Sequence, residues 1–231
     1  MTRQLLRQSS VADLYRGWRF VFNNGLKYRH IQAFQNIPGY LTAKEAKALY
    51  DAAARLPRKA PAVVEIGSHL GRSSFVLAKA LKRTGGGVLH CIDPFDASGD
   101  ASAAADYKRR RSDLRLSLLD QFRANMRRRG VGAFVQPMPG LSHEVVKSFD
   151  APMVDMVFID GDHDYSAVRR DFDDWVPRLP KGGIVALHDV FATPFDGHYD
   201  GPWRVVQESV VNNPDWKWFR LIDTLALAEK C

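Results

Sequence analysis

The sequence has little cysteine and no long apolar run. Its 231 residues include only two cysteines, Cys91 and Cys231, which is too few for a disulfide framework or a four-cysteine zinc site. No apolar run approaches the ~18 residues of a membrane span, and the first residues lack the apolar segment of a secretory signal. With 45% hydrophobic and 26% charged residues, the composition is that of a globular protein, and we expect a cytoplasmic location.

Two nucleotide-binding motifs are also missing. His69 and Arg72 stand where the G-x-G-x-x-G fingerprint of nicotinamide-dependent enzymes needs glycine. No Gly-Lys-Ser/Thr follows this segment, as a P-loop would require. The sequence therefore disfavours both an NAD-dependent enzyme and a P-loop NTPase.

Acidic residues are scarce in two segments, and the net charge is +7. Residues 1–30 carry six basic residues and one acid, and residues 106–129 carry nine basic residues and three acids. Such segments favour an anionic partner, which could be phospholipid, nucleic acid or an acidic substrate. For residues 106–129 the simpler interpretation is a solvated helix face. An RNA partner is disfavoured, because the sequence has no appended RNA-binding module.

Short apolar runs alternate with longer helical stretches along residues 61–231. This alternation is typical of a parallel sheet with helices on both faces, so the sequence predicts an α/β, doubly wound fold. Strands are expected at residues 62–67, 88–93, 134–137, 153–160, 184–188, 217–222 and 225–228. Helices are expected at residues 71–83, in the stretch ending at 129, and at 142–149, 165–176 and 203–211. Asp223 and Thr224 separate the last two strands and suit the turn of a closing hairpin.

Residues 1–60 precede this pattern and are predicted to form an N-terminal helical extension of the domain at 61–231. A second helix of the extension is expected at 43–55. The first helix is expected to have an apolar face formed by Leu14, Trp18 and Val21 or Phe22. This face would pack on the core or on a second subunit of a homo-oligomer. The alternatives are a lid over the site and a helix at a membrane surface.

A glycine-containing turn follows the first strand of the domain. The segment Glu65-Ile-Gly-Ser-His-Leu-Gly71 allows a tight turn, and the helix after it offers free N–H groups at its N-terminus. At the end of the second strand, Asp93 could accept both hydroxyls of a ribose. Phe95 could stack on a base or belong to the core. The alternative for the first segment is a purely structural turn.

Two further strands end in ionisable residues. Asp160, Asp162, His163 and Asp164 follow one buried strand, and such a cluster is costly unless it is paired or solvated. One of these acids could simply cap the next helix. His188 and Asp189 end the following strand, so Asp160 and Asp189 are expected to share a divalent cation. His188 would be a third ligand, which favours Mn²⁺ over Mg²⁺, or would instead hydrogen-bond a substrate.

In this order, E-I-G-x-x-x-G-R-S-S, I-D-P-F, F-I-D-G-D-H-x-Y and P-x-G-G-x-x-x-x-H-D-V resemble a known family. They look like the class I S-adenosylmethionine (SAM) dependent O-methyltransferases of the "methyltransferase domain 24" type, which include sugar and macrolide O-methyltransferases. The resemblance covers residues 60–212. It implies a Rossmann-like, seven-stranded sheet whose last strand is antiparallel, and a hydroxyl of a small molecule or glycan as the methyl acceptor.

The resemblance also implies roles for individual residues. His163 would remove the proton of the acceptor, with Asp160 and His188 beside it. Asp160 and Asp189 would hold Mg²⁺ or Mn²⁺ together with His188, which stands where metal-dependent members have an acid. The residues implied to contact SAM are Glu65, Gly67, Ser68, Gly71, Ser73, Ser74, Asp93, Pro94, Phe95, Leu141, Ser142 and Asp160. The alternatives are an RNA methyltransferase that uses the basic surface and a non-catalytic interaction protein with the same fold.

Overall fold

The computed structural model describes residues 10–96, 98, 116–191 and 200–231, with only the backbone described for 10–13. Its centre is a seven-stranded sheet in the order β3-β2-β1-β4-β5-β7-β6. Six strands run in one direction, and β7 is antiparallel to both of its neighbours, β5 and β6. The predicted doubly wound sheet and its reversed last strand are therefore confirmed. The strands are β1 (Ala62–Ile66), β2 (Val88–Asp93), β3 (Val135–Pro139), β4 (Met156–Ile159), β5 (Ile184–Leu187), β6 (Trp216–Ile222) and β7 (Leu225–Lys230).

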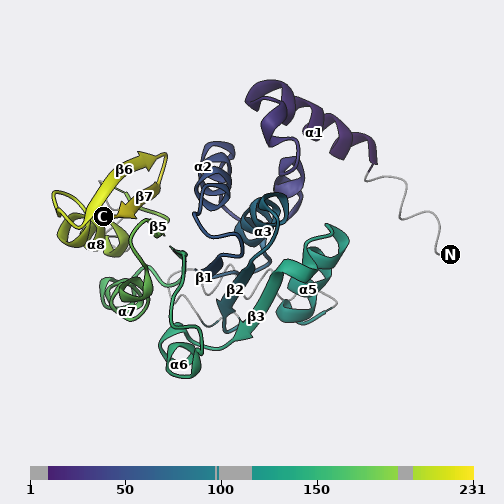
Figure 1. The fold of residues 1–231 in the computed structure, drawn as a ribbon. Helices are drawn as coiled ribbons and strands as arrows, with labels where there is room; N and C mark the ends of the chain where they lie inside the picture. The colour runs from purple at the N-terminus through teal and green to yellow at the C-terminus, as the bar shows by residue number, and fades with distance from the viewer. Residues whose placement is uncertain (1–9, 97, 99–115, 192–199) are drawn as a thin grey trace.

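Helices cover both faces of this sheet (Figure 1). One face carries α2 (Ala43–Ala54), α3 (Arg72–Thr84) and α5 (Leu118–Arg128), and the other carries α6 (Ser142–Val145), α7 (Tyr165–Trp175) and α8 (Gly201–Ser209). Successive strand residues point to opposite faces. Val63 thus belongs to the first core cluster and Val64 to the second. Both faces are apolar, which explains the near-continuous apolar runs in the sequence.

The extension begins with α1 (Ser10–Asn24) and continues through two short 3-10 helices, Leu26–Tyr28 and Gln32–Asn36, to α2. Five buried apolar side chains before α2 belong to the same core cluster as α3: Phe20, Ile31, Phe34, Ile37 and Leu41. The arginine of α3, Arg72, donates to the backbone oxygen of Gly39 and lies over the Phe34 ring. The extension is thus packed on the domain, while its role stays a prediction. None of the helices among the described residues is long and apolar enough to cross a membrane.

The inward face of α1 agrees with the predicted one only at Val21, which is half-buried and packs on the core cluster. Leu14, Trp18 and Phe22 are exposed, while Phe20 is buried and packs edge-on against Phe34 with ring centroids 5.6 Å apart. Gly17 lies on the same buried side as Phe20, and a Cβ at that position would lie 2.6 Å from the side-chain oxygen of Gln32. The helix therefore approaches the core along its glycine side, and its larger apolar stripe faces outward.

The first ten residues of the basic segment predicted at residues 106–129 lie outside the described residues, which resume at 116. In the part that is described, Arg123, Arg127 and Arg128 of α5 are exposed. These three side chains fit the solvated helix face.

Candidate active site

The loops after β1 and β4 touch at the carboxyl edge of the sheet. Gly67 has φ +88, and a Cβ there would lie 1.9 Å from the backbone oxygen of Asp160. Only glycine permits this approach, because any other residue would be both strained and in collision with backbone. Gly67 therefore sets the distance between the two loops that carry the candidate site residues.

Asp93 is held rigidly at the end of β2. Its Oδ2 accepts the backbone N–H of His69 at 2.8 Å, and its Oδ1 accepts that of Phe95 at 2.6 Å. Burial raises the pKa of the Asp93 carboxyl, and the two N–H donors offset part of that effect. Each oxygen keeps a lone pair, so the carboxylate can still accept ribose hydroxyls.

A cavity of about 280 Å³ lies between these loops. Six of the predicted cofactor residues line it: Gly67, Asp93, Pro94, Leu141, Ser142 and Asp160. The other six are not among its lining residues: Glu65, Ser68, Gly71, Ser73, Ser74 and Phe95. The cavity is of a size and position that suit a nucleoside cofactor at the carboxyl ends of parallel strands.

Several of the predicted residues outside the lining support the loops beneath the cavity. Glu65 is fully buried, and its carboxylate accepts from the hydroxyls of Ser68, at 2.7 Å, and Ser74. Burial raises the pKa of Glu65, while its serine donors lower it in part. Gly71 is the left-handed N-cap of α3. Phe95 packs against Phe122 with ring centroids 5.2 Å apart, which favours the core interpretation.

Asp171 of α7 lines the cavity and was not singled out from the sequence. It is buried and accepts from the Ser142 hydroxyl. Burial raises the pKa of Asp171 to about 6, and the Ser142 donor opposes this rise. Only its helical spacing was visible in the sequence, and that spacing gives no sign that the side chain reaches Ser142, 29 positions earlier.

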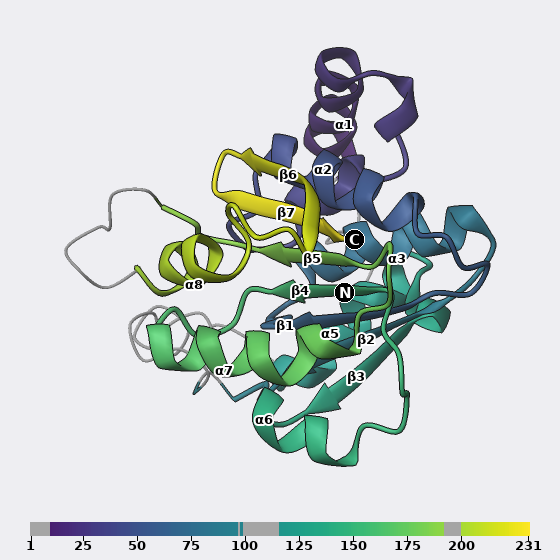
Figure 2. The ribbon, with the colours of Figure 1, turned by 60° about the vertical axis from the view of Figure 1, so that its left-hand side comes forward.

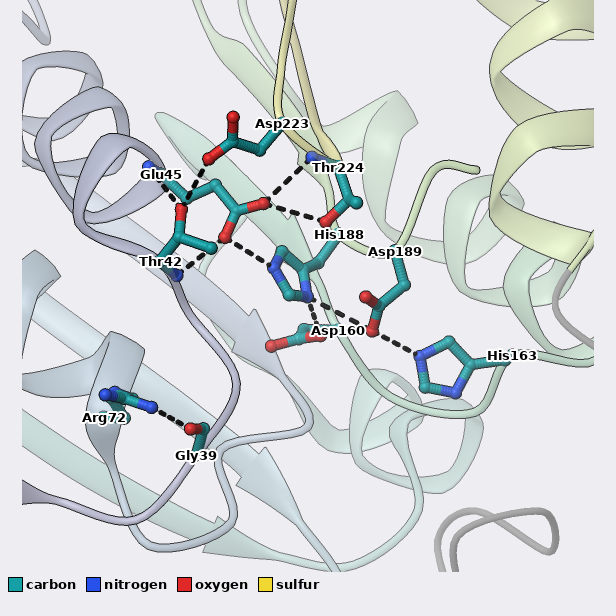
Figure 3. Close-up of polar contacts among 10 residues, drawn as sticks. All are labelled: Gly39, Thr42, Glu45, Arg72, Asp160, His163, His188, Asp189, Asp223 and Thr224. Carbon is teal, nitrogen blue, oxygen red and sulfur yellow. Dashed lines mark hydrogen bonds and ion pairs between the residues drawn. The ribbon is translucent and has the colours of Figure 1, made fainter. Parts of the chain in front are cut away.

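Four ionisable side chains meet at the ends of β4 and β5, as the sequence predicted (Figure 3). His163 Nε2 lies 3.0 Å from Asp189 Oδ2. His188 Nδ1 lies 3.1 Å from Asp160 Oδ1 and 3.3 Å from Asp189 Oδ2. Asp189 reaches both histidines from a left-handed backbone conformation, φ +55. Burial alone would raise the pKa of Asp189, but the two histidines outweigh it and lower that pKa.

A fifth member of the cluster, Glu45, comes from α2 in the extension. Its Oε2 lies 3.2 Å from His188 Nε2, and its Oε1 accepts from the backbone N–H and hydroxyl of Thr224 at 3.0 and 2.8 Å. Both nitrogens of His188 thus lie within 3.3 Å of carboxylate oxygens, which favours the doubly protonated, charged ring. Burial alone would lower the pKa of His188, and the carboxylates around it raise that pKa well above its usual value.

Sequence reasoning missed Glu45. The only local signal is Thr42-x-x-Glu45, the pattern of a capping box, and Glu45 does complete one at the start of α2. That pattern assigns a helix start and gives no hint of contact with His188, 143 positions away.

The donor set suits a cation in type and spacing. Ligand atoms of Asp160, His163 and Asp189 all lie within 4.8 Å of one another. Two carboxylate oxygens and an imidazole nitrogen are donors that Mn²⁺ and related ions accept. The predicted ligands were Asp160, His188 and Asp189, so this group has His163 in place of His188. The two nitrogens of His188 face carboxylates instead. Metal binding itself stays a prediction.

A seven-stranded sheet in this order, with one reversed strand and a cofactor-sized cavity at its carboxyl edge, defines a class I SAM-dependent methyltransferase. Residues 64–190 match the family model Methyltransf_24, described as a methyltransferase domain, and the chain belongs to that family. This match covers more than half of the sequence.

Solved structures share the fold. One is the O-methyltransferase TomG from Streptomyces achromogenes, which is involved in tomaymycin synthesis and was solved with SAM. Its TM-score is 0.59 at 21% identity, and the similarity covers 100% of this chain and 99% of that one. An O-methyltransferase from Bacillus cereus, solved with S-adenosylhomocysteine (SAH), has a TM-score of 0.61 at 17% identity, over 92% and 96% of the two chains.

One curated relative is more similar over a short stretch. The uncharacterized protein y4gI of Sinorhizobium fredii is 31% identical over 71 residues, which is 31% of this chain. The match spans only 8% of that protein's own length.

Proposed function

We propose that the chain is an O-methyltransferase that moves the methyl group of SAM to a hydroxyl of a small molecule or glycan. The observation that carries this proposal is the contact of His163 with Asp189 at 3.0 Å, beside Asp160, which lines the cofactor cavity. A base oriented by a carboxylate at the mouth of a methyl-donor site is what transfer to a hydroxyl needs.

In this proposal the cavity binds SAM. Asp93 accepts the ribose hydroxyls from its fixed position, and Ser142 with Asp171 borders the adenine. Asp160 lies where the cavity meets the histidine cluster, so the methyl group is presented at that end. Alignment of donor and acceptor supplies the largest share of the rate, of the order of 7–11 kcal/mol for well-oriented groups.

The transfer is an in-line displacement. The acceptor oxygen attacks the methyl carbon, the sulfur–carbon bond breaks, and its electron pair stays on sulfur, so SAH and a methyl ether form. The hydroxyl proton passes to His163. Asp189 orients the His163 ring and stabilises its charged form, and a positioned base of this kind contributes roughly 10²–10⁴-fold. If a divalent cation is bound at Asp160, His163 and Asp189, it would polarise the hydroxyl, and His163 would then act as a ligand and not as the base.

Calorimetric titration of SAM into the protein tests the first half of the proposal, with Mn²⁺ and then with EDTA. We expect binding that Asp93→Ala abolishes, and a change between the two conditions would indicate a metal requirement. No SAM binding in either condition would refute the proposal.

The second half is tested by SAH release with a panel of hydroxylated glycans and small-molecule alcohols. His163→Ala should keep its SAM affinity and lose at least about 100-fold in turnover. His30→Ala, which alters a histidine of the extension paired with Arg83, is the matched control. Turnover that survives in His163→Ala would remove this residue from the mechanism.

A further inference from the structure

The outward face of α1 is an unusually apolar surface for this molecule. Among the described residues, five of the eleven exposed large hydrophobic side chains lie between positions 14 and 26. They are Leu14, Tyr15, Trp18, Phe22 and Leu26, and they are between 64% and 88% exposed. We call these five side chains, four on α1 and Leu26 on the 3-10 helix after it, the α1 patch. Exposed large apolar side chains that gather in one segment point to an interaction site.

The patch is presented by a helix that is anchored from its other side. Phe20 is buried against Phe34, and Gly17 packs on Gln32. Both views place α1 at the outer edge of the molecule, away from the sheet (Figure 2). The five side chains are therefore not available to the chain's own core.

Charge decides what covers the α1 patch. Residues 14–42 contain four basic residues and no acid. At 100° per residue, Arg19 and Arg16 follow the apolar arc directly around the helix, and both side chains are exposed. Arg29 is exposed just beyond the patch, while Lys27 pairs with Asp51 at 2.7 Å.

This combination fits an anionic lipid surface. Trp and Tyr prefer the boundary between headgroups and acyl chains, and arginines beside them contact anionic headgroups. A second copy of the chain fits less well, because a two-fold contact through this stretch would bring basic residues together with no acid from 14–42 between them. We propose that the α1 patch docks the enzyme on membranes that contain anionic phospholipid, with α1 lying in the plane of the interface.

Vesicle co-sedimentation of the full chain tests this proposal. Vesicles of phosphatidylcholine mixed with phosphatidylglycerol should bind the protein at least about tenfold more tightly than vesicles of phosphatidylcholine alone. Added salt should weaken the binding, because exposed charges are screened.

Trp18→Ser combined with Phe22→Ser should lower binding to the anionic vesicles by at least about tenfold. Both side chains are mostly exposed, so the fold and the binding of SAM are expected to persist. The matched control is Phe219→Ser combined with Leu221→Ser, which removes two exposed apolar side chains from β6 and should leave vesicle binding unchanged.

Three outcomes would overturn the proposal. The first is no binding of the wild type to anionic vesicles, and the second is equal binding by the Trp18/Phe22 variant. The third is a wild-type dimer in sedimentation equilibrium that this variant lacks, since a second copy would then cover the patch. None of these results bears on SAM binding or methyl transfer, so the proposed function stands or falls separately.

Discussion

Replacing Glu45 by Gln should destabilise the protein strongly, although the change is isosteric. Glu45 is 1% exposed, and its carboxylate is bound by Thr42, Thr224 and His188. Burial alone would raise the pKa of Glu45, but His188 and the backbone N–H groups outweigh it and lower the pKa from 4.5 to about 2. At 1.36 kcal/mol per pKa unit, this shift corresponds to about 3 kcal/mol of folding stability at neutral pH.

The sign of the pH dependence follows from the direction of the shift. A lowered pKa in the folded state contributes stability above the unfolded pKa, near 4.5, and this contribution is lost as the pH falls toward 2. The free energy of unfolding of Glu45→Gln should therefore lie below that of the wild type by about 3 kcal/mol at pH 7 and by only about 1 kcal/mol at pH 3.

Urea unfolding curves, extrapolated linearly to water, measure both differences. The matched control is Asp223→Asn, which removes a carboxylate from the same contact between α2 and the β6–β7 turn. Because Asp223 pairs at the surface with Lys44, its loss should cost less than about 1 kcal/mol. Equal effects of the two variants, or a loss in Glu45→Gln that does not shrink in acid, would refute the reasoning.

Two further substitutions test the cofactor cavity. Gly67→Ala should lower the free energy of unfolding by at least about 2 kcal/mol, because its Cβ would meet the backbone of Asp160 at 1.9 Å. Gly85→Ala is its control, since Gly85 has a similar φ of +100 and no atom lies within 4 Å of the added Cβ. An equal loss of stability in the control would show that backbone strain, and not the collision with Asp160, causes the effect. Asp171→Asn should stabilise the protein above pH 6 by up to about 3 kcal/mol. The reason is that the pKa of Asp171 is raised to about 6 in the folded state, so the wild type loses stability as the pH rises from about 4 to 6. The same variant should bind SAM more weakly. Calorimetry measures the SAM affinity, and unfolding curves at pH 4 and pH 8 measure the free energy of unfolding. No change in either quantity would contradict the reasoning.

The strands and the loops that carry the site could be predicted because their signals are local. Apolar runs mark β1, β4 and β5, and each ends in polar residues. Parallel neighbours end at one edge of the sheet, so Asp160 and Asp189 had to lie close together. The contact of His163 with Asp189 could be predicted for the same reason, because His163 follows Asp160 by only three residues and therefore lies at the same edge of the sheet.

The rest depends on contacts between distant parts of the chain. Glu45 meets Thr224 across 179 positions, and nothing near Glu45 in the sequence reports this. Glu65 looked like a cofactor residue because it stands in the motif, yet the fold buries it beneath the loop. Periodicity identified α1 but not its inward face, because both Phe20 and the Leu14–Trp18–Phe22 stripe are apolar, and contact with Phe34, 14 positions later, determines which of them is buried.

The place of β7 in the sheet has a consequence for biosynthesis. β7 is the last strand along the chain, but it lies between β5 and β6, pairing Ala228 with Val185 and Leu225 with Ile222. While the protein is being made, the edge of β5 therefore has no partner until Leu225–Lys230 have emerged from the ribosome. An unpaired strand edge recruits other chains, so a nascent chain that stalls before Leu225 should be the form most prone to aggregate. Thr224, whose N–H and hydroxyl bind Glu45 beside His188, emerges at the same late moment, so the candidate site cluster is completed only when β7 joins the sheet.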